Sequence, residues 1–201
     1  MGLREKHKKQ RRRGILAAAK QLFVHNGYAA TSMQGIAARS DVSVGTLYNY
    51  FSSKQRLMLA VVREDAESLY ESPMPTGKDP FDAVYEYLCR VVDFTLGYGR
   101  DLVRELVIAS IAEAHSEMGV EMMEMDWRFV GKLTELFQNQ RRSGSLLPGA
   151  DSSRLAWICY SLLMTELILL TFDPHRTEKL LKDSLRESVK TVLRGNLKGN
   201  G

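Results

Sequence analysis

"TSMQGIAARSDVSVGTLYNYF", residues 31–51, reads as two short amphipathic segments joined by a tight connection. Ala37 is small enough to let the two segments approach closely, Val42 can fill the gap at the turn, and Leu47 can anchor the second segment. Ser43 is a good N-cap for that second segment. The pattern therefore predicts a helix-turn-helix, although many helical hairpins share these few positions.

The flanking segments complete a small three-helix head. Upstream, one apolar stripe recurs at helical spacing before a break at Gly27, and its members are Ile15, Leu16, Ala19, Leu22 and Phe23. Downstream, a longer helical pattern begins at Ser52 or Ser53 and runs to about Tyr70. We expect this fourth helix to connect the head to the rest of the chain.

Charge is unevenly divided along the chain. Residues 1–56 hold eleven Lys/Arg and two acids, a net charge of +9, whereas residues 57–201 hold seventeen Lys/Arg and twenty-two acids, a net charge of −5. A basic head on an acidic body suggests that the head alone meets a polyanion. Charge by itself does not exclude a basic tail that is merely solvated.

The remaining chain is also helical in its periodicity. Breaks at 71–80, 141–153 and 173–176 separate helices expected near 79–97, 100–115, 118–142, 152–172 and 175–194. No alternating strand pattern is present, so the prediction is an all-α protein of about nine helices. We expect two domains. Residues 1–56 form an N-terminal arm and a helix-turn-helix head, and residues 57–201 form a larger helical body.

The longest apolar run, 155–172, is nearly long enough to cross a membrane, but it contains Glu166 and several hydroxyl groups. A buried helix in a core or a subunit interface is the favoured interpretation. Cys89 and Cys159 show no metal-type spacing, and no apolar leader precedes the basic run, so we expect a cytoplasmic protein without a structural metal or cofactor.

Residues 15–57 closely resemble the DNA-binding domain of TetR-family transcriptional regulators. The resemblance rests on residues in register throughout this stretch, namely Ile15, Ala18, Ala19, Leu22, Phe23, Gly27, Tyr28, Thr31, Ser32, Ile36, Ala37, Val42, Ser43, Gly45, Leu47, Tyr48, Tyr50, Phe51, Lys54 and Leu57. It covers the first quarter of the chain. It implies a sequence-specific DNA-binding regulator, a homodimeric repressor that a small molecule releases from a palindromic operator.

The resemblance also implies that helix 43–49 enters the major groove and that helix 32–39 braces against the DNA backbone. Hydroxyl groups and free N–H groups at helix starts suit phosphates, and so does a nearby lysine. The expected DNA-binding residues are Thr31, Ser32, Gln34, Ser43, Val44, Gly45, Thr46, Tyr48, Asn49, Tyr50 and Lys54. Because "SVGTLYN" carries no Arg or Lys, we expect readout weighted towards A·T pairs and backbone shape.

Two interpretations of the basic arm, residues 4–13, stay open. In TetR-family members such an arm can reach the minor groove, and its cations suit that role. A disordered tail that only aids solubility is the alternative. In either case the arm should steepen the salt dependence of DNA binding.

The body is expected to supply the dimer interface and the ligand site. The resemblance places dimerisation in the last two helices, near 152–172 and 175–194, and an inducer pocket among the central helices. Pocket candidates are Phe94, Tyr98, Met118, Met122, Met123, Trp127, Trp157 and Glu166, since methionines and aromatic residues line adaptable pockets. For any one of them a place in the core is the favoured interpretation. Glu166 should either pair with an arginine across an interface, which is favoured, or bind a cationic ligand.

Two other classes of function compete with a regulator. The four histidines stand far apart and no nucleophile elbow, phosphate loop or HExxH motif is present, which argues against an enzyme. A non-specific, nucleoid-type nucleic-acid-binding protein would share the basic head. The large apolar and acidic body argues against it, because packaging DNA requires no such body.

Overall fold

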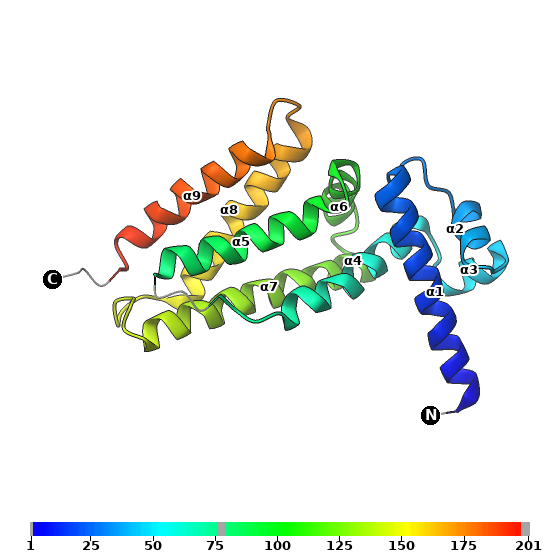
Figure 1. The fold of residues 1–201 in the computed structure, drawn as a ribbon, viewed down its shortest axis with the longest axis horizontal. Coiled ribbons are helices and arrows are strands. Elements are labelled where there is room, and N and C mark those ends of the chain that lie inside the picture. Colours follow the sequence, from blue (N-terminus) through cyan, green and yellow to red (C-terminus); the bar gives the residue numbers. More distant parts are fainter. Residues whose placement is uncertain (1, 76–78, 198–201) are drawn as a thin grey trace. The chain divides into compact units, whose positions relative to one another are not determined.

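The computed structural model describes residues 2–75 and 79–197, and within these ranges every regular element is an α-helix. The helices are α1 (Leu3–Asn26), α2 (Met33–Arg39), α3 (Val44–Tyr50), α4 (Lys54–Glu71), α5 (Pro80–Leu96), α6 (Arg100–Ala112), α7 (Glu117–Arg142), α8 (Ser152–Phe172) and α9 (Glu178–Arg194). Figure 1 shows their course along the chain. The predicted all-α fold is confirmed.

The helices pack into two compact units. The first comprises Met1–Ser68 and Leu96–Met122, and the second comprises Leu69–Thr95 and Met123–Gly201. Helices α4 and α7 each contribute one end to each unit. The sequence suggested a division at residue 56, whereas the packing joins most of α4 and all of α6 to the helix-turn-helix.

The first unit has one apolar core, to which five of its helices contribute. Its fully buried side chains include Ile15 and Phe23 of α1, Ile36 of α2, Leu47 of α3, Leu57 of α4 and Leu102 of α6. These positions recur at helical spacing, so each helix presents one apolar stripe to the others. Helix α3 therefore rests on a core that extends well beyond residue 51.

Polar contacts fix α1 to α4 inside this unit. The Lys20 Nζ lies 2.8 Å from an Asp65 carboxylate oxygen, and Arg12 lies 3.6 Å from Glu64. The buried Tyr98 hydroxyl donates a hydrogen bond to the same Asp65 carboxylate. Burial, together with that carboxylate, raises the pKa of Tyr98. Asp65 thus links α1, α4 and the segment before α6.

Helix α1 begins at Leu3, which differs from the non-helical arm expected over residues 4–13. All residues from 2 to 14 are exposed, and the buried stripe starts only at Ile15. Lys, Arg, Gln and Glu are all good helix formers, so intrinsic propensity favours continuing the helix through this charged stretch.

The first turn of α7 is held tightly in the first unit. Arg56 of α4 donates to Glu121 over 3.0 Å and lies 3.5 Å from Glu117, while Arg63 lies 3.4 Å from Glu121. A Cβ added at Gly119 would sit 2.2 Å from the Glu113 carbonyl oxygen. Glycine is therefore required where this turn meets the end of α6.

The second unit packs α5, α8, α9 and most of α7 around a second core. Its fully buried side chains include Val84, Leu88, Leu133, Phe137, Leu163 and Leu185. The Tyr87 and Phe129 rings stack with centroids 5.6 Å apart. The Tyr70 hydroxyl, from the end of α4, donates to the Met125 carbonyl over 3.1 Å.

Helix α8 carries apolar side chains on its exposed side as well as on its buried side. Its buried side faces α9 and the rest of the unit, while Ile158, Ile168, Leu169 and Phe172 are 39%, 43%, 42% and 54% exposed. It is the single helix in the described part of the chain that is long and apolar enough to cross a membrane by length and composition. The buried Glu166 carboxylate accepts hydrogen bonds from Arg176 and Ser184, so its arginine partner comes from the same chain and not from across an interface as the sequence suggested.

Candidate functional site

The two helices of the helix-turn-helix are each capped by a serine. The Ser32 Oγ accepts from the Gly35 N–H over 3.0 Å, and the Ser43 Oγ accepts from the Thr46 N–H over 3.0 Å. Between the helices Asp41 adopts φ 53°, a conformation that Asp tolerates better than most side chains. These local features orient α3 on α2, and in Figure 1 the two helices lie together beside α1.

Helix α3 presents a polar outer surface. Ser43, Gly45, Tyr48 and Asn49 are exposed, and Tyr48 keeps 47% of its surface open. Leu47 is fully buried and holds the helix down. The arrangement offers hydroxyl and amide groups, together with the N-terminal end of a helix, to a ligand on the outside.

Other expected DNA-binding residues are less open. Val44, Thr46 and Tyr50 are half-buried, and the Thr46 hydroxyl lies 2.8 Å from the Ser43 hydroxyl. Ser32 and Gln34 are exposed on the neighbouring surface of α2.

Gly45 has no internal packing reason to be glycine. A Cβ added there would meet only the Ser43 Oγ, at 4.0 Å. Its φ is not in the left-handed region, since the described glycines with positive φ stand at 27, 99 and 144. A constraint on residue 45 must therefore come from something that approaches α3 from outside.

Thr31 does not face outwards as the sequence suggested. It is 3% exposed, and its hydroxyl donates to the Leu22 carbonyl at 3.1 Å and the Gly27 carbonyl at 2.8 Å. The neighbouring Ser32 is the true N-cap, and a Thr-Ser pair leaves that choice open in the sequence. The prediction that the Thr31 side chain contacts phosphate is therefore corrected.

Lys54 is also used inside the head. Its Nζ donates to the Tyr28 and Thr31 carbonyls, both over 2.9 Å, and lies 4.2 Å from the centre of the Tyr28 ring. Two of its three donors are thus bound. Burial, with a smaller contribution from Glu105, raises the pKa of Tyr28 to about 12.

The expected pocket residues are divided between the two units. Tyr98, Met118 and Met122 belong to the first unit, while Phe94, Met123, Trp127, Trp157 and Glu166 belong to the second. Trp127 and Trp157 do meet, edge to face with centroids 5.1 Å apart, beside a surface hollow of about 280 Å³. Tyr98 and Glu166 are occupied by internal hydrogen bonds.

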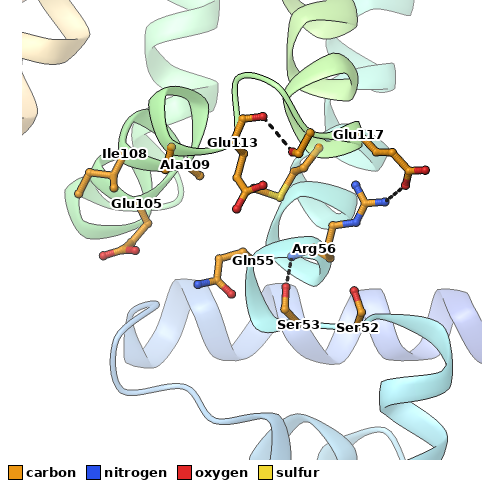
Figure 2. A pocket seen from close by; sticks show the side chains of 12 residues that line it. Ser52, Ser53, Gln55, Arg56, Glu105, Ile108, Ala109, Glu113 and Glu117 are labelled. Atoms are coloured by element: carbon orange, nitrogen blue, oxygen red, sulfur yellow. Dashed lines mark hydrogen bonds and ion pairs between the residues drawn. The ribbon is translucent and has the colours of Figure 1, made fainter.

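A groove of about 630 Å³ lies in the first unit, between the start of α4, the second half of α6 and the start of α7. Figure 2 shows Glu105 and Ile108 of α6 on one side and Gln55 and Arg56 of α4 on the other. Of the expected pocket residues only Met118 lines it.

The groove combines acidic and apolar groups. Three carboxylates line it, at Glu105, Glu113 and Glu117, together with the guanidinium of Arg56. None of these four residues was expected from the sequence, because the groove is formed by helices about 60 residues apart in the chain and no local motif marks it.

In the described part of the chain, no group of three His, Cys, Asp or Glu is placed to hold a metal ion.

Comparison with known proteins extends these observations. The family model described as "Bacterial regulatory proteins, tetR family" matches residues 15–61. The HTH-type transcriptional regulator UidR of Escherichia coli (strain K12) is 41% identical over 185 residues, which cover 89% of this chain and 91% of UidR.

A second curated relative matches a shorter part of the chain, and a solved structure matches nearly all of it. The HTH-type transcriptional repressor KstR of Rhodococcus jostii is 32% identical over 129 residues, and the match spans 63% of this chain but little more than half, 57%, of KstR. Among solved structures, Salmonella enterica GusR shares 26% identity with a TM-score of 0.65, covering 92% of this chain and 96% of GusR.

Proposed function

The chain belongs to the tetR family of bacterial regulatory proteins and is a DNA-binding transcriptional regulator, and from this premise we propose that it is a homodimeric repressor that a small molecule releases from a palindromic operator. The observation that carries the proposal is the polar outer surface of α3, which is held by a buried Leu47 and capped by Ser43. We place its action in the cytoplasm, where the operator lies.

The DNA contacts follow from what α2 and α3 expose. Ser32 and Ser43 stand at helix starts, where N–H groups and the helix dipole favour phosphate. Tyr48 can direct its hydroxyl to a phosphate oxygen, and Asn49 can bind an adenine edge. Gly45 lets the backbone of α3 approach the base edges closely.

Dimerisation is proposed through the open side of α8 together with α9. Four large apolar side chains of α8 are exposed there, and Leu180 of α9 is 48% exposed. Apolar patches of this kind mark interaction sites in soluble proteins. Two copies of the head would then meet two half-sites of a palindrome about one helical turn apart.

The groove between α4, α6 and α7 is the proposed effector site. Glu105 and Glu113 line it, and neither carries an ion pair among the residues that the structure describes, while Ile108, Ala112 and Met118 give it apolar surface. This combination suits an organic cation with an apolar body. Ser52 and Ser53, which join α3 to α4, also line the groove, so a ligand there would contact the connection to the recognition helix directly.

A competition experiment tests the regulator against a non-specific DNA-binding protein. Operators would be located by genomic footprinting, and a labelled operator would be challenged with unlabelled operator or with random DNA. A repressor should prefer its operator by about a thousandfold or more. Equal competition by random DNA would exclude the proposed function.

The effector site is tested with paired probes of opposite charge. Decyltrimethylammonium should release the operator complex, measured by fluorescence anisotropy, whereas decanoate of equal chain length should not. The variant Glu105→Gln/Glu113→Gln should keep its operator affinity but lose the response, and Glu86→Gln/Glu135→Gln, on α5 and α7 of the second unit, is the matched control. An unchanged response in the groove variant would place the effector elsewhere.

A further inference from the structure

The first eleven residues of α1, 3–13, form a helical extension that projects beyond the core of the first unit. All of them are exposed, and they carry seven Lys/Arg and one acid, Glu5. Within the described part of the chain Arg12 anchors the extension, through an ion pair with Glu64 and a guanidinium 5.5 Å from the centre of the Phe51 ring. Tertiary packing therefore supports only its last turn.

Repulsion between like charges destabilises the helix over residues 3–13. Like charges stand four residues apart at Arg4 and Lys8, at Lys8 and Arg12, and at Lys9 and Arg13, and such pairs destabilise a helix. Cations also lie at the positive end of the helix dipole, and the Gly2 N-cap makes no side-chain hydrogen bond. The extension has good intrinsic helix propensity and continues a helix that is already folded, but no anions are present to offset the repulsion between its cations.

We propose that residues 3–13 are a second DNA-binding element, a helix that lies against the phosphate backbone and is stabilised by the phosphates that it neutralises. This proposal rests on the proposed function for its ligand, DNA. Bound phosphates would replace the repulsion between the cations with attraction, so helix formation and binding become coupled. The extension would add affinity and salt dependence without adding base readout.

The chemistry of the extension favours DNA over an anionic membrane. A helix that binds in a membrane interface needs an apolar face opposite its cations. Leu3 is the only apolar residue in 3–13, and the cations are spread around the helix. An α-helix with its side chains is wider than the minor groove, so in its helical form the extension would contact the outer phosphates, in contrast to the extended arm considered for the minor groove.

The variant Lys6→Gln/Lys8→Gln separates a binding helix from a merely structural one. It removes both like-charge pairs that contain Lys8 and keeps the favourable spacing of Glu5 and Lys9. In the free protein we expect the far-UV circular dichroism to show more helix than in the unmodified chain. On a short random-sequence duplex we expect weaker binding, with the slope of log K against log salt reduced by about 0.9 for each phosphate that the variant no longer neutralises.

A matched control removes the same charge elsewhere. Arg90→Gln/Lys132→Gln lies in the second unit, on α5 and α7, where each cation pairs with an acid of its own helix, and its salt slope should stay unchanged. Equal slopes for the Lys6/Lys8 variant and the unmodified chain would overturn the proposal. Loss of binding to phosphatidylcholine vesicles containing phosphatidylserine, with DNA binding kept, would also overturn it by showing a membrane role.

The same experiment keeps the two proposals apart. Random DNA carries phosphates but no operator, so the change in salt slope tests the extension alone. Competition between operator and random DNA tests the regulator alone. If the protein did not prefer its operator to random DNA, the regulator proposal would fail, but the change in salt slope could still be seen. If the protein were a specific repressor with an unchanged salt slope, only the proposal for residues 3–13 would fail.

Discussion

Gly45 lies where we propose that DNA approaches, whereas Gly131 lies in the second unit, away from any proposed DNA contact. The two glycines can therefore be compared directly. Both lie in helices, both are exposed, and an added Cβ would meet nothing closer than 4.0 Å at either position. Alanine should therefore be tolerated by the fold at both, and should stabilise the helix by up to about 1 kcal/mol.

The variant Gly45→Ala is expected to raise the melting temperature and yet weaken operator binding, by roughly tenfold, because the new methyl group holds α3 away from the bases. Gly131→Ala should raise the melting temperature with no change in affinity. Calorimetry and anisotropy measure the two effects. Full operator affinity in Gly45→Ala would show that DNA does not approach this residue.

The variant Tyr48→Phe is expected to weaken binding to every DNA sequence alike, by about tenfold, because it loses a hydrogen bond to a charged phosphate. Tyr85→Phe, a loss of one hydroxyl in the second unit, is the control and should bind normally. Binding to operator and to random duplexes would be compared. A changed ratio between the two would mean that Tyr48 reads bases.

At the residue scale, the sequence predicted helix N-caps better than it predicted which side chains are free to contact a ligand. Ser43 caps α3 as expected, since a serine before a helical pattern has few alternatives. Thr31 was misplaced because its hydroxyl finds two carbonyls, one of them nine residues earlier, and that partner depends on tertiary packing. Tyr98 was placed in a pocket for the same reason, since its partner Asp65 lies 33 residues away.

At the scale of elements, the contact between α7 and α8 includes a half-buried acid, Asp126, whose charged form is destabilised by the fold. Burial raises the pKa of Asp126, and the hydroxyl of Tyr160, which is hydrogen-bonded to it, opposes this only in part. A carboxyl group whose pKa is raised in the folded state favours folding when protonated, and that contribution is lost as the pH rises through the folded pKa.

Asp126→Asn should therefore stabilise the protein at neutral pH, raising the melting temperature by a few degrees. The gain should shrink as the pH falls towards 3.8, the ordinary pKa of the group. Thermal melts of both proteins across this range provide the measurement, and Asp173→Asn, at an exposed acid, is the control. A gain that does not depend on pH would contradict the electrostatic cause.

Apolar periodicity predicted the elements of the chain well and their ends less well. Helices α5 to α8 lie within three residues of the expected bounds, because turn residues mark their limits. The start of α1 was missed because a run of cations resembles a solvated tail, although all residues of 3–13 except His7 are good helix formers. The groove could not be predicted, since it depends on how α4, α6 and α7 pack.

At the scale of the whole molecule, the dimer interface proposed on the open side of α8 would decide whether the protein can bind two half-sites at once. Ile168→Glu/Phe172→Glu places two charges on the proposed interface and should give monomers, with operator affinity reduced by about a hundredfold or more as bivalent binding is lost. Ile111→Glu changes a side chain that is 75% exposed in α6 and should stay dimeric.

Sedimentation velocity would report the oligomeric state of both variants, and circular dichroism would confirm that each is folded. A dimer that survives the two charges on α8 would refute the interface. Monomers that keep full operator affinity would instead refute the need for two heads.

The core shared by the helix-turn-helix, α4 and α6 has a practical consequence for any attempt to isolate the DNA-binding part. A fragment ending at residue 56 would lack Leu57, Met58, Val61 and Leu102, all buried in that core. It would also lose the Asp65 carboxylate that holds Lys20. Such a fragment should not fold autonomously, and the smallest piece that keeps this core intact is discontinuous, residues 2–68 joined to 96–122.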